Sequence, residues 1–135
     1  MQVTVKHIAE MTFEGVGKSG EVTKIVASSA DTELKGASPM ELVLMGIASC
    51  SGVDIINILE KMRLKFDRFE ISVEGERAPD YSRVFTAIDV IYRFWGSDLP
   101  EKRIKHAIEL SMDKYCSVIN MVNKTAKINY KLEIE

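Results

Sequence analysis

The alternation of apolar and polar residues predicts a β-hairpin at the start of the chain. Residues 2–13 and 21–27 carry apolar side chains at nearly alternate positions, as strands with one buried face do. Three glycines lie between these runs, in residues 14–20, and glycine-rich segments of this length favour a turn. Residues 28–37 are polar and are expected to form a loop that leads into a helix.

A long central helix is predicted from residue 38 to about residue 63. Ser38 suits the N-cap, Pro39 suits the first helical position, and Glu41 follows the cap by three residues, which is the spacing of a capping box. Apolar side chains then cover most of the helix circumference up to residue 59. A helix that is apolar on all sides is expected to be buried.

This helix approaches the length of about 20 apolar residues that a membrane span requires. Three polar side chains near its C-terminal half, Asp54, Asn57 and Glu60, argue against that interpretation. We therefore expect a buried helix of a protein that does not enter a membrane.

The second half of the chain predicts another hairpin, a second helix and a closing strand. Apolar and polar residues alternate in residues 69–74 and again in residues 84–94, with a proline-containing turn at residues 75–82 between them. Asp98 suits an N-cap for a helix that runs to about Asn123 with an apolar face of period 3.6. Strict alternation at the C-terminus, in residues 128–134, predicts the last strand.

The predicted order is therefore ββ-α-ββ-α-β, which is an α+β fold. A chain of 135 residues suits one domain, residues 1–135. Five strands and two helices are too few to cover a helix that is apolar on every side. We therefore expect a dimer in which each central helix also packs against the partner subunit.

Composition excludes several classes of function. The 18 basic and 20 acidic residues are mixed along the chain, so no basic surface for nucleic acid is expected. The N-terminal residues lack the apolar core of a signal peptide, and we expect a cytoplasmic protein. Two cysteines and two histidines are too few for a disulfide scaffold or a structural zinc site.

The two cysteines are the candidate reactive groups. Cys50 lies in the central helix between small residues, Ser49, Ser51 and Gly52, which leave room for a substrate or another backbone near the sulfur. A thiolate can be oxidised to a sulfenic acid, and a second thiol such as Cys116 can then capture it as a disulfide. That reaction requires the two Cα atoms to come within about 7 Å of each other.

Paired sequence motifs give the chain a resemblance to a known superfamily. The segments Ser38-Pro39-Met40-Glu41-Leu42, Ala48-Ser49-Cys50-Ser51-Gly52-Val53-Asp54 and Lys114-Tyr115-Cys116-Ser117-Val118 resemble those of the osmotically inducible protein C (OsmC) and organic hydroperoxide resistance (Ohr) superfamily. They are most similar to its YhfA-like branch. The resemblance covers essentially the whole chain.

The resemblance implies an intertwined homodimer with two active sites at the subunit interface. It also implies an oxidoreductase of the oxidative stress response, a peroxidase or hydroperoxide reductase that acts on organic hydroperoxides. Cys50 would be the peroxidatic thiol and Cys116 the resolving thiol. An external dithiol would reduce the resulting disulfide, without a metal or an organic cofactor.

The sequence departs from the pattern of the peroxidases at two positions. Those proteins carry a glutamate ten residues before the peroxidatic cysteine and an arginine after the first strand, whereas Met40 occupies the first position here. Glu41 is the nearest carboxylate, and Lys18 is the nearest cation in the early loop. Arg77 and Arg83 are further candidates for the missing arginine.

These departures leave two alternatives to the peroxidase. One is a dimeric protein of the same fold that binds a small molecule with little or no catalysis. The other is a protein whose cysteines only fill the core.

Asp54 shares a helix face with Cys50, and we expect it to hydrogen-bond across the dimer or to cap a neighbouring helix.

Overall fold

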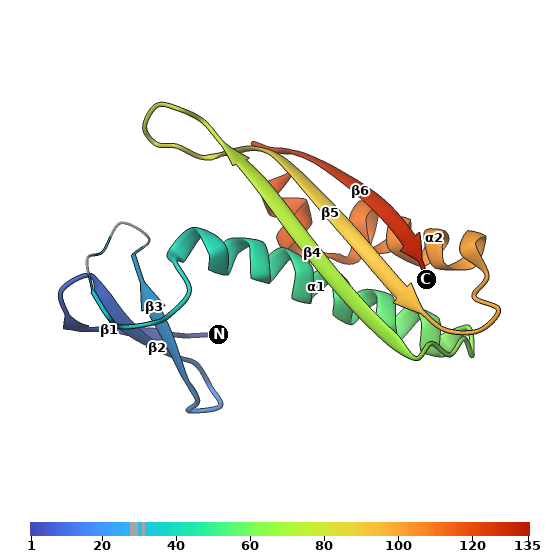
Figure 1. Cartoon of the computed structure of the whole chain (residues 1–135), viewed down its shortest axis with the longest axis horizontal. Coiled ribbons are helices and arrows are strands. Elements are labelled where there is room, and N and C mark those ends of the chain that lie inside the picture. Colours follow the sequence, from blue (N-terminus) through green and yellow to red (C-terminus); the bar gives the residue numbers. More distant parts are fainter. Residues whose placement is uncertain (28–29, 31) are drawn as a thin grey trace. The chain divides into compact units, whose positions relative to one another are not determined.

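The computed structural model describes residues 1–27, 30 and 32–135. Ser28, Ser29 and Asp31 belong to the loop predicted at residues 28–37 and lie outside the described residues. Figure 1 shows the elements in chain order. They are β1 (Thr4–Ala9), β2 (Thr12–Val16), β3 (Val22–Val26), α1 (Pro39–Lys61), β4 (Arg68–Arg77), β5 (Phe85–Trp95), α2 (Glu101–Leu110), the π-helical turn η1 (Ser111–Tyr115), α3 (Ser117–Val122) and β6 (Lys127–Ile134).

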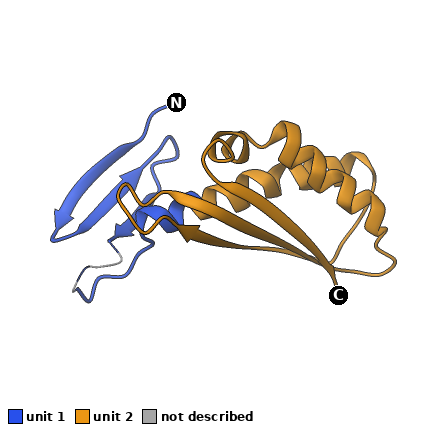
Figure 2. Ribbon diagram, turned by 90° about the horizontal axis from the view of Figure 1, so that it is seen from above, with its two compact units in different colours: residues 1–43 blue, residues 44–135 orange. Residues whose placement is uncertain are grey.

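The chain divides into two compact units, residues 1–43 and residues 44–135, which Figure 2 shows in different colours. The α+β class is confirmed, because one three-stranded sheet lies in each unit and helices accompany the second.

Unit 1 contains an antiparallel meander in the order β1-β2-β3. The prediction of one strand over residues 2–13 is wrong, because this segment turns back on itself between β1 and β2. Glu10 lies in the turn with a φ of 51°, a left-handed conformation that ends the first strand. The imperfect alternation around Ile8 and Met11 reflects this turn and the irregular register between His7 and Ala9.

Unit 2 contains a mixed sheet in the order β4-β5-β6. β4 and β5 form an antiparallel hairpin, and β6 returns parallel to β5. β4 extends to Arg77, so part of the turn predicted at residues 75–82 belongs to the strand. Figure 2 shows the helices of this unit on one side of the sheet.

A β-bulge sets which side chains of β5 face the helices. Arg77 pairs with Phe85 and Glu76 pairs with Ala87, so Thr86 is the extra residue on β5. This bulge explains why Thr86 interrupts the apolar face that the sequence predicts. Beyond it, four side chains of β5 are fully buried, Ile88, Val90, Tyr92 and Phe94.

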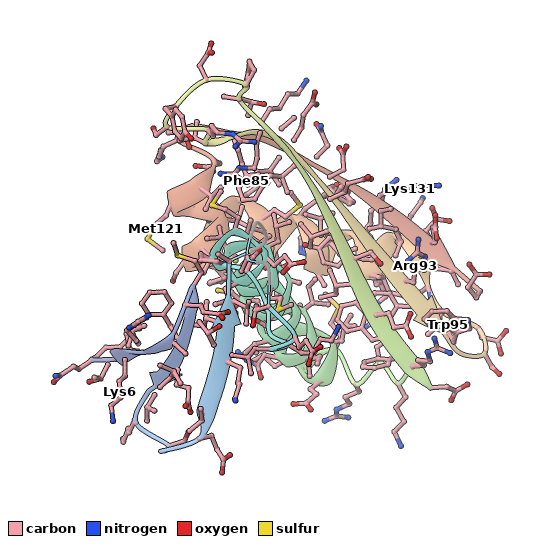
Figure 3. All side chains as sticks on the ribbon, turned by 60° about the vertical axis from the view of Figure 1, so that its left-hand side comes forward. Lys6, Phe85, Arg93, Trp95, Met121 and Lys131 are labelled. Carbon is pink, nitrogen blue, oxygen red and sulfur yellow. The ribbon has the colours of Figure 1, made fainter. Side chains whose placement is uncertain are left out.

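The opposite face of the same sheet is polar. Arg93, whose position Figure 3 marks together with Lys131, donates hydrogen bonds to Glu133 at 2.7 Å and to Ser72 at 2.9 Å. Lys131 forms an ion pair with Glu133 at 2.9 Å. A sheet with one apolar and one charged face presents only the apolar face to the helices.

The helix α1 begins with the predicted capping box. The backbone N–H of Ser38 donates to Glu41 Oε2 at 2.7 Å, and the backbone N–H of Glu41 donates to Ser38 Oγ at 3.2 Å. Within unit 2, α1 packs closely on β4 at Gly52. A Cβ atom at Gly52 would lie 2.9 Å from Ile71 Cδ1, so this glycine allows the close approach.

Only one face of α1 is buried in the chain itself. Ile47, Ser51, Gly52, Ile55 and Leu59 are buried, whereas other apolar side chains of the helix remain exposed, namely Val43, Met45, Val53 and Ile56. The prediction that the helix is more apolar than its own chain can cover is therefore confirmed. By length and composition alone, α1 is also the one helix among the described residues that could cross a membrane.

The second predicted helix is wrong in its start and in its continuity. Asp98 has a φ of 54° and is not the N-cap, which is Pro100 without a side-chain cap. The helical segment also does not run unbroken to Asn123. α2 passes into the π-helical turn η1, the chain becomes extended at Cys116, and α3 follows as a separate short helix.

Candidate thiol site

The two cysteines lie on different helical segments of unit 2. Cys50 is in the middle of α1 and is partly exposed, whereas Cys116 is fully buried. Cys116 is the N-cap of α3, with a φ of −72° and a ψ of 107°. Both thiols are reduced in this structure.

The fold brings the two sulfurs together with one carboxylate. The Sγ atoms of Cys50 and Cys116 and a carboxylate oxygen of Asp54 all lie within 4.8 Å of one another. Cys50 and Asp54 are four residues apart on α1, so they share one face of the helix. The third member, Cys116, comes from the break between η1 and α3.

The π-helical turn is what presents Cys116 to α1. The backbone N–H of Cys116 donates to Ser111 O at 2.8 Å, five residues earlier, and this bond ends the π-helical turn. Asn120 then bridges the break, because its side-chain amide donates to Met112 O at 3.2 Å and to Cys116 O at 2.8 Å. These two hydrogen bonds satisfy carbonyl groups at a point where the helix is interrupted.

A chain of buried hydroxyl groups runs beside the thiols. Tyr92 OH and Ser51 Oγ are 2.6 Å apart, and the Ser111 hydroxyl lies 3.3 Å from Ser51 Oγ. Ser111 Oγ also donates to Asp54 Oδ2 at 3.0 Å. The side chains of Tyr92, Ser51 and Ser111 are fully buried, so each hydroxyl depends on these bonds for its hydrogen bonding. Within its own chain, Asp54 thus accepts a side-chain hydrogen bond from Ser111. The bond across a dimer and the cap of a neighbouring helix that the sequence predicts stay predictions.

Burial shifts the acid–base behaviour of the groups at this site. Burial raises the pKa of the Cys116 thiol to about 12, while the Ile119 N–H, which donates to Cys116 Sγ at 3.4 Å, acts in the opposite direction. Burial likewise raises the pKa of Tyr92 to about 12. Both groups are therefore protonated near neutral pH.

Asp54 also borders a small cavity. Its volume is about 150 Å³, and its other lining residues are Asn57, Ile58, Lys61 and Tyr115. The cavity lies at the carboxylate end of the thiol site. There, Lys61 contributes a cation and Tyr115 contributes an aromatic ring. The cavity gives small polar molecules space beside Asp54.

A second hollow, of about 400 Å³, runs along the exposed face of α1 and reaches β4. Six residues of α1 line it, Met45, Ala48, Ser49, Gly52, Val53 and Ile56, together with Phe69 and Ile71. Cys50 is not among the residues that line this groove, so the groove and the sulfur lie on different faces of the helix.

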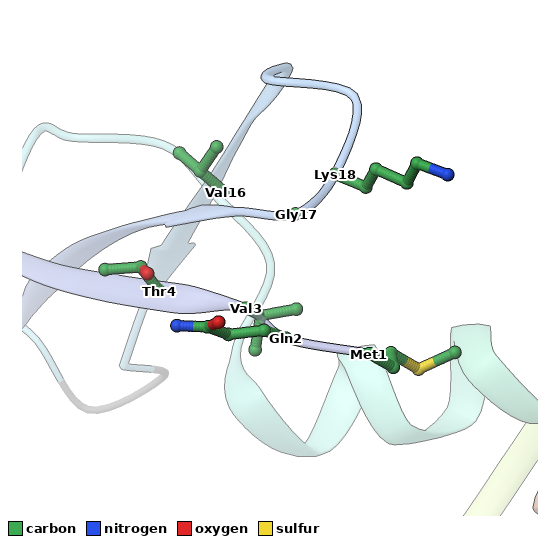
Figure 4. A pocket seen from close by; sticks show the side chains of 7 residues that line it. All are labelled: Met1, Gln2, Val3, Thr4, Val16, Gly17 and Lys18. Atoms are coloured by element: carbon green, nitrogen blue, oxygen red, sulfur yellow. The ribbon is translucent and has the colours of Figure 1, made fainter.

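The other predicted site residues have separate positions. Glu41 belongs to unit 1 and forms the capping box with Ser38, which holds the pKa of its carboxyl below the usual value. Lys18 is exposed in unit 1, beside a hollow of about 840 Å³ lined by the N-terminal residues and by the end of β2 with the turn that follows it (Figure 4). Their predicted roles beside the thiolate remain predictions.

The two candidate arginines lie around the turn between β4 and β5. Arg77 Nε donates to the backbone oxygen of Arg83 at 2.9 Å, and both side chains are exposed. His7 and His106 are also exposed.

The sequence did not predict the hydrogen-bonding roles of three residues at the site, namely Ser51, Tyr92 and Ser111. The alternation of β5 indicated that Tyr92 faces the core, but no pattern indicated that its hydroxyl would meet Ser51. Ser111 carried a detectable signal, since it is a polar residue at an apolar position of the predicted helix.

Comparisons with known proteins agree on one family. The OsmC-like protein family matches residues 30–131. Protein YhfA of Escherichia coli K12 is 36% identical over 134 residues, which are 99% of this chain and 98% of that protein.

Solved structures give the same result. A hypothetical protein from Aquifex aeolicus is 32% identical, with a TM-score of 0.84 over 99% of this chain and 96% of that chain. The organic hydroperoxide resistance protein OhrB of Bacillus subtilis has the same fold, with 20% identity and a TM-score of 0.67 over 99% of this chain and 96% of that chain. The sequence match, the near full-length coverage and the shared fold lead to one conclusion: this chain belongs to the OsmC-like protein family.

Proposed function

We propose that this protein is a thiol-dependent peroxidase that reduces organic hydroperoxides through a Cys50 sulfenic acid and a Cys50–Cys116 disulfide. The OsmC/Ohr superfamily includes peroxidases, which supports the reaction class. The observation that carries the proposal is the separation of the two sulfurs, which is within 4.8 Å. A sulfenic acid formed at one of them would be within reach of the other after a small movement.

The proposed cycle has three steps. The Cys50 thiolate attacks the terminal peroxide oxygen, the O–O bond breaks, and the alkoxide leaves as an alcohol after taking a proton. Cys116 sulfur then attacks the sulfenic sulfur, the S–O bond breaks, and hydroxide leaves as water with the proton of Cys116. An external dithiol reduces the disulfide and restores both thiols.

The raised pKa of Cys116 supports the division of roles. A thiol that stays protonated near neutral pH is a poor first nucleophile, so Cys116 suits the resolving step. Its proton must leave when it attacks. The Asp54 carboxylate, within 4.8 Å of both sulfurs, is close enough to accept that proton and to pass it to the departing hydroxide.

We further propose that the active form is a cytoplasmic homodimer. The exposed apolar side chains of α1 support the dimer, because a soluble monomer rarely exposes such a continuous apolar surface. OsmC/Ohr proteins are typically homodimeric, and OsmC-like proteins are generally soluble. Roles for Lys18, Glu41, Arg77 or Arg83 at the thiolate belong to the same proposal.

Peroxide consumption with a dithiol reductant tests the cycle. Cys50→Ser should abolish the consumption of cumene hydroperoxide, and Cys116→Ser should accumulate a sulfenic acid that a dimedone probe labels at Cys50. Glu60→Gln is the matched control, since Glu60 lies on the same helix with an exposed side chain. A fully active Cys50→Ser protein would refute the proposal.

A second candidate is a dimeric protein that binds a small apolar molecule and catalyses little. The apolar groove along α1 and the presence of Met40 in place of a glutamate favour it. It predicts a peroxide reaction no faster than that of a free thiol and a ligand that remains bound through purification. Native mass spectrometry of the purified protein, together with the rate measurement, separates the two functions.

A further inference from the structure

We propose that the reduced protein binds one thiophilic divalent cation, such as Zn²⁺, between Cys50 Sγ, Cys116 Sγ and the Asp54 carboxylate. Two thiolates and one carboxylate are a ligand set that zinc accepts, with a fourth position left for water. The three ligand atoms already lie within 4.8 Å of one another. The sequence alone gave no reason to expect such a site, because the third ligand becomes evident only when the fold brings Cys116 to α1.

The spacing requires little movement. With Zn–S bonds of about 2.3 Å, two sulfurs of a tetrahedral site lie about 3.8 Å apart, and a sulfur and a carboxylate oxygen lie slightly closer. An upper bound of 4.8 Å therefore leaves each pair within about one ångström of the required separation. Cys50 and Asp54 are partly exposed, which leaves their side chains room to rotate for this adjustment.

Neighbouring groups orient the ligands as they do in known metal sites. Ser111 Oγ donates to Asp54 Oδ2 at 3.0 Å, which fixes one carboxylate oxygen and leaves the other for a cation. The backbone N–H of Ile119 points at Cys116 Sγ at 3.4 Å, a contact that favours the thiolate form a metal requires. The cavity of about 150 Å³ beside Asp54 provides room for the fourth ligand, a water molecule.

Metal binding would exclude peroxide chemistry at the same sulfurs. Each thiol releases its proton when the sulfur coordinates, so binding of one cation displaces two protons and changes no oxidation state. A sulfur whose lone pair is held by zinc is a weaker nucleophile toward peroxide. The cation would therefore protect both thiols until a competing chelator removes it.

Spectroscopy with cobalt tests the site independently of any enzyme activity. The reduced protein, freed of metal, is titrated with Co²⁺, which gives thiolate charge-transfer absorption and visible bands diagnostic of four-coordinate geometry. One Co²⁺ per chain is expected, and Zn²⁺ should bleach the bands by displacement. Cobalt binding can be measured even if the protein has no peroxidase activity. The metal site and the peroxidase function can therefore fail separately.

Variants assign the ligands. Asp54→Asn and Cys50→Ser should each weaken metal binding by about 100-fold or more, and Ser111→Ala should weaken it about 10- to 100-fold through loss of ligand orientation. Glu60→Gln is the matched control on the same helix, with an exposed side chain, and should bind as the wild type does. Circular dichroism establishes that each variant is folded.

Three results would overturn the proposal. The first is that Co²⁺ does not bind with a dissociation constant in the micromolar range or tighter and gives no charge-transfer band. The others are a wild-type affinity in Asp54→Asn and an unchanged charge-transfer band in Cys50→Ser. Wild-type affinity in Asp54→Asn would mean that the carboxylate is not a ligand. An unchanged charge-transfer band in Cys50→Ser would mean that the metal lies elsewhere.

Discussion

At the scale of single residues, the thiol site depends on hydroxyl groups that no solvent reaches. Tyr92, Ser51 and Ser111 are each fully buried, and each bonds to the next toward Asp54. A buried hydroxyl without a partner costs more free energy than a single hydrogen bond returns. These hydroxyl groups therefore hold the Asp54 carboxylate in place, on the face of α1 that also carries Cys50.

Tyr92→Phe tests the contribution of this chain of hydroxyls. Loss of the 2.6 Å bond to Ser51 should lower the free energy of unfolding by about 1 kcal/mol. Tyr130→Phe is the control, because the Tyr130 hydroxyl bonds to Glu109 at an exposed position and its loss should cost less. Urea denaturation of both variants gives the comparison, and equal losses would contradict the argument.

The raised pKa of Cys116 predicts how stability depends on pH. The thiol has an ordinary pKa of 9.0 in the unfolded chain and a pKa of about 12 in the folded chain. Above pH 9.0 the unfolded state therefore loses this proton first, so the folded state becomes less stable as the pH rises toward about 12. Tyr92, whose pKa rises from 10.0 to about 12, acts in the same direction.

Cys116→Ser separates the thiol from the tyrosine, since serine does not titrate in this range. Under reducing conditions, the decline in stability as the pH rises above 9.0 should be shallower in Cys116→Ser than in the wild type. Urea denaturation at a series of pH values measures both slopes. Identical slopes would show that the thiol does not contribute.

At the scale of elements, the break after η1 controls the position of the resolving sulfur. Asn120 donates to carbonyl groups on both sides of the break, at Met112 and at Cys116. A continuous helix would follow the 3.6-residue period and turn Cys116 to another direction. π-helical turns are common at functional sites for this reason.

Asn120→Ala should loosen this break. We expect a loss of about 1 kcal/mol in stability, because two carbonyl groups lose a donor, and a several-fold slower formation of the Cys50–Cys116 disulfide. Asn123→Ala, at an exposed position at the end of α3, is the control and should change neither quantity. Mass spectrometry after timed exposure to peroxide measures the disulfide. An unaltered rate in Asn120→Ala would show that the break holds without this side chain.

The sequence predicted the elements that depend on periodicity and missed those that depend on local backbone geometry. The capping box, the buried face of β5 and the closing strand followed from the pattern of residues. The positive φ at Asp98 and the break at Cys116 did not, because each is a single-residue departure that leaves the apolar pattern intact. The turn at Glu10 disturbed the alternation only slightly, so it did not divide the predicted strand.

At the scale of the whole molecule, each unit leaves apolar side chains exposed. In unit 1, Val3, Val5 and Ile8 are exposed, and in unit 2 Met45 and Val53 are exposed on α1. A three-stranded sheet and a long helix with uncovered apolar residues need further burial to be stable in water. A second copy of the chain is the partner that we propose.

Met45→Lys tests the proposed dimer. The side chain of Met45 is 53% exposed, and a lysine there would place a charge in an apolar interface. We expect the protein to become a monomer in sedimentation experiments at micromolar concentration. Asn129→Lys, which adds the same charge beside Asp89 on the polar face of the sheet, should leave the dimer intact. A dimer that survives Met45→Lys would remove α1 from the proposed interface.

The candidate site was partly visible in the sequence. Cys50 and Cys116 were identified from their motifs, and the position of Asp54 on the Cys50 face followed from helix periodicity. The resemblance implied that the two thiols approach each other, but the residues alone did not place Asp54 beside both sulfurs, because that arrangement depends on how η1 packs against α1 through Ser111 and Ser51. Contacts between residues about 60 positions apart are set by tertiary packing, which no local pattern encodes.

The position of the two sulfurs also has a mechanical consequence. They are 66 residues apart in the sequence, and a covalent link between them would close a loop around the whole β4–β5 hairpin and α2. Loop entropy alone would then stabilise the oxidised chain by roughly 4 kcal/mol relative to its reduced form. The oxidised protein should therefore melt at a higher temperature and resist proteolysis longer. Each turnover would alternately stiffen and relax the fold, and the resting reduced form would be the one that proteases degrade first.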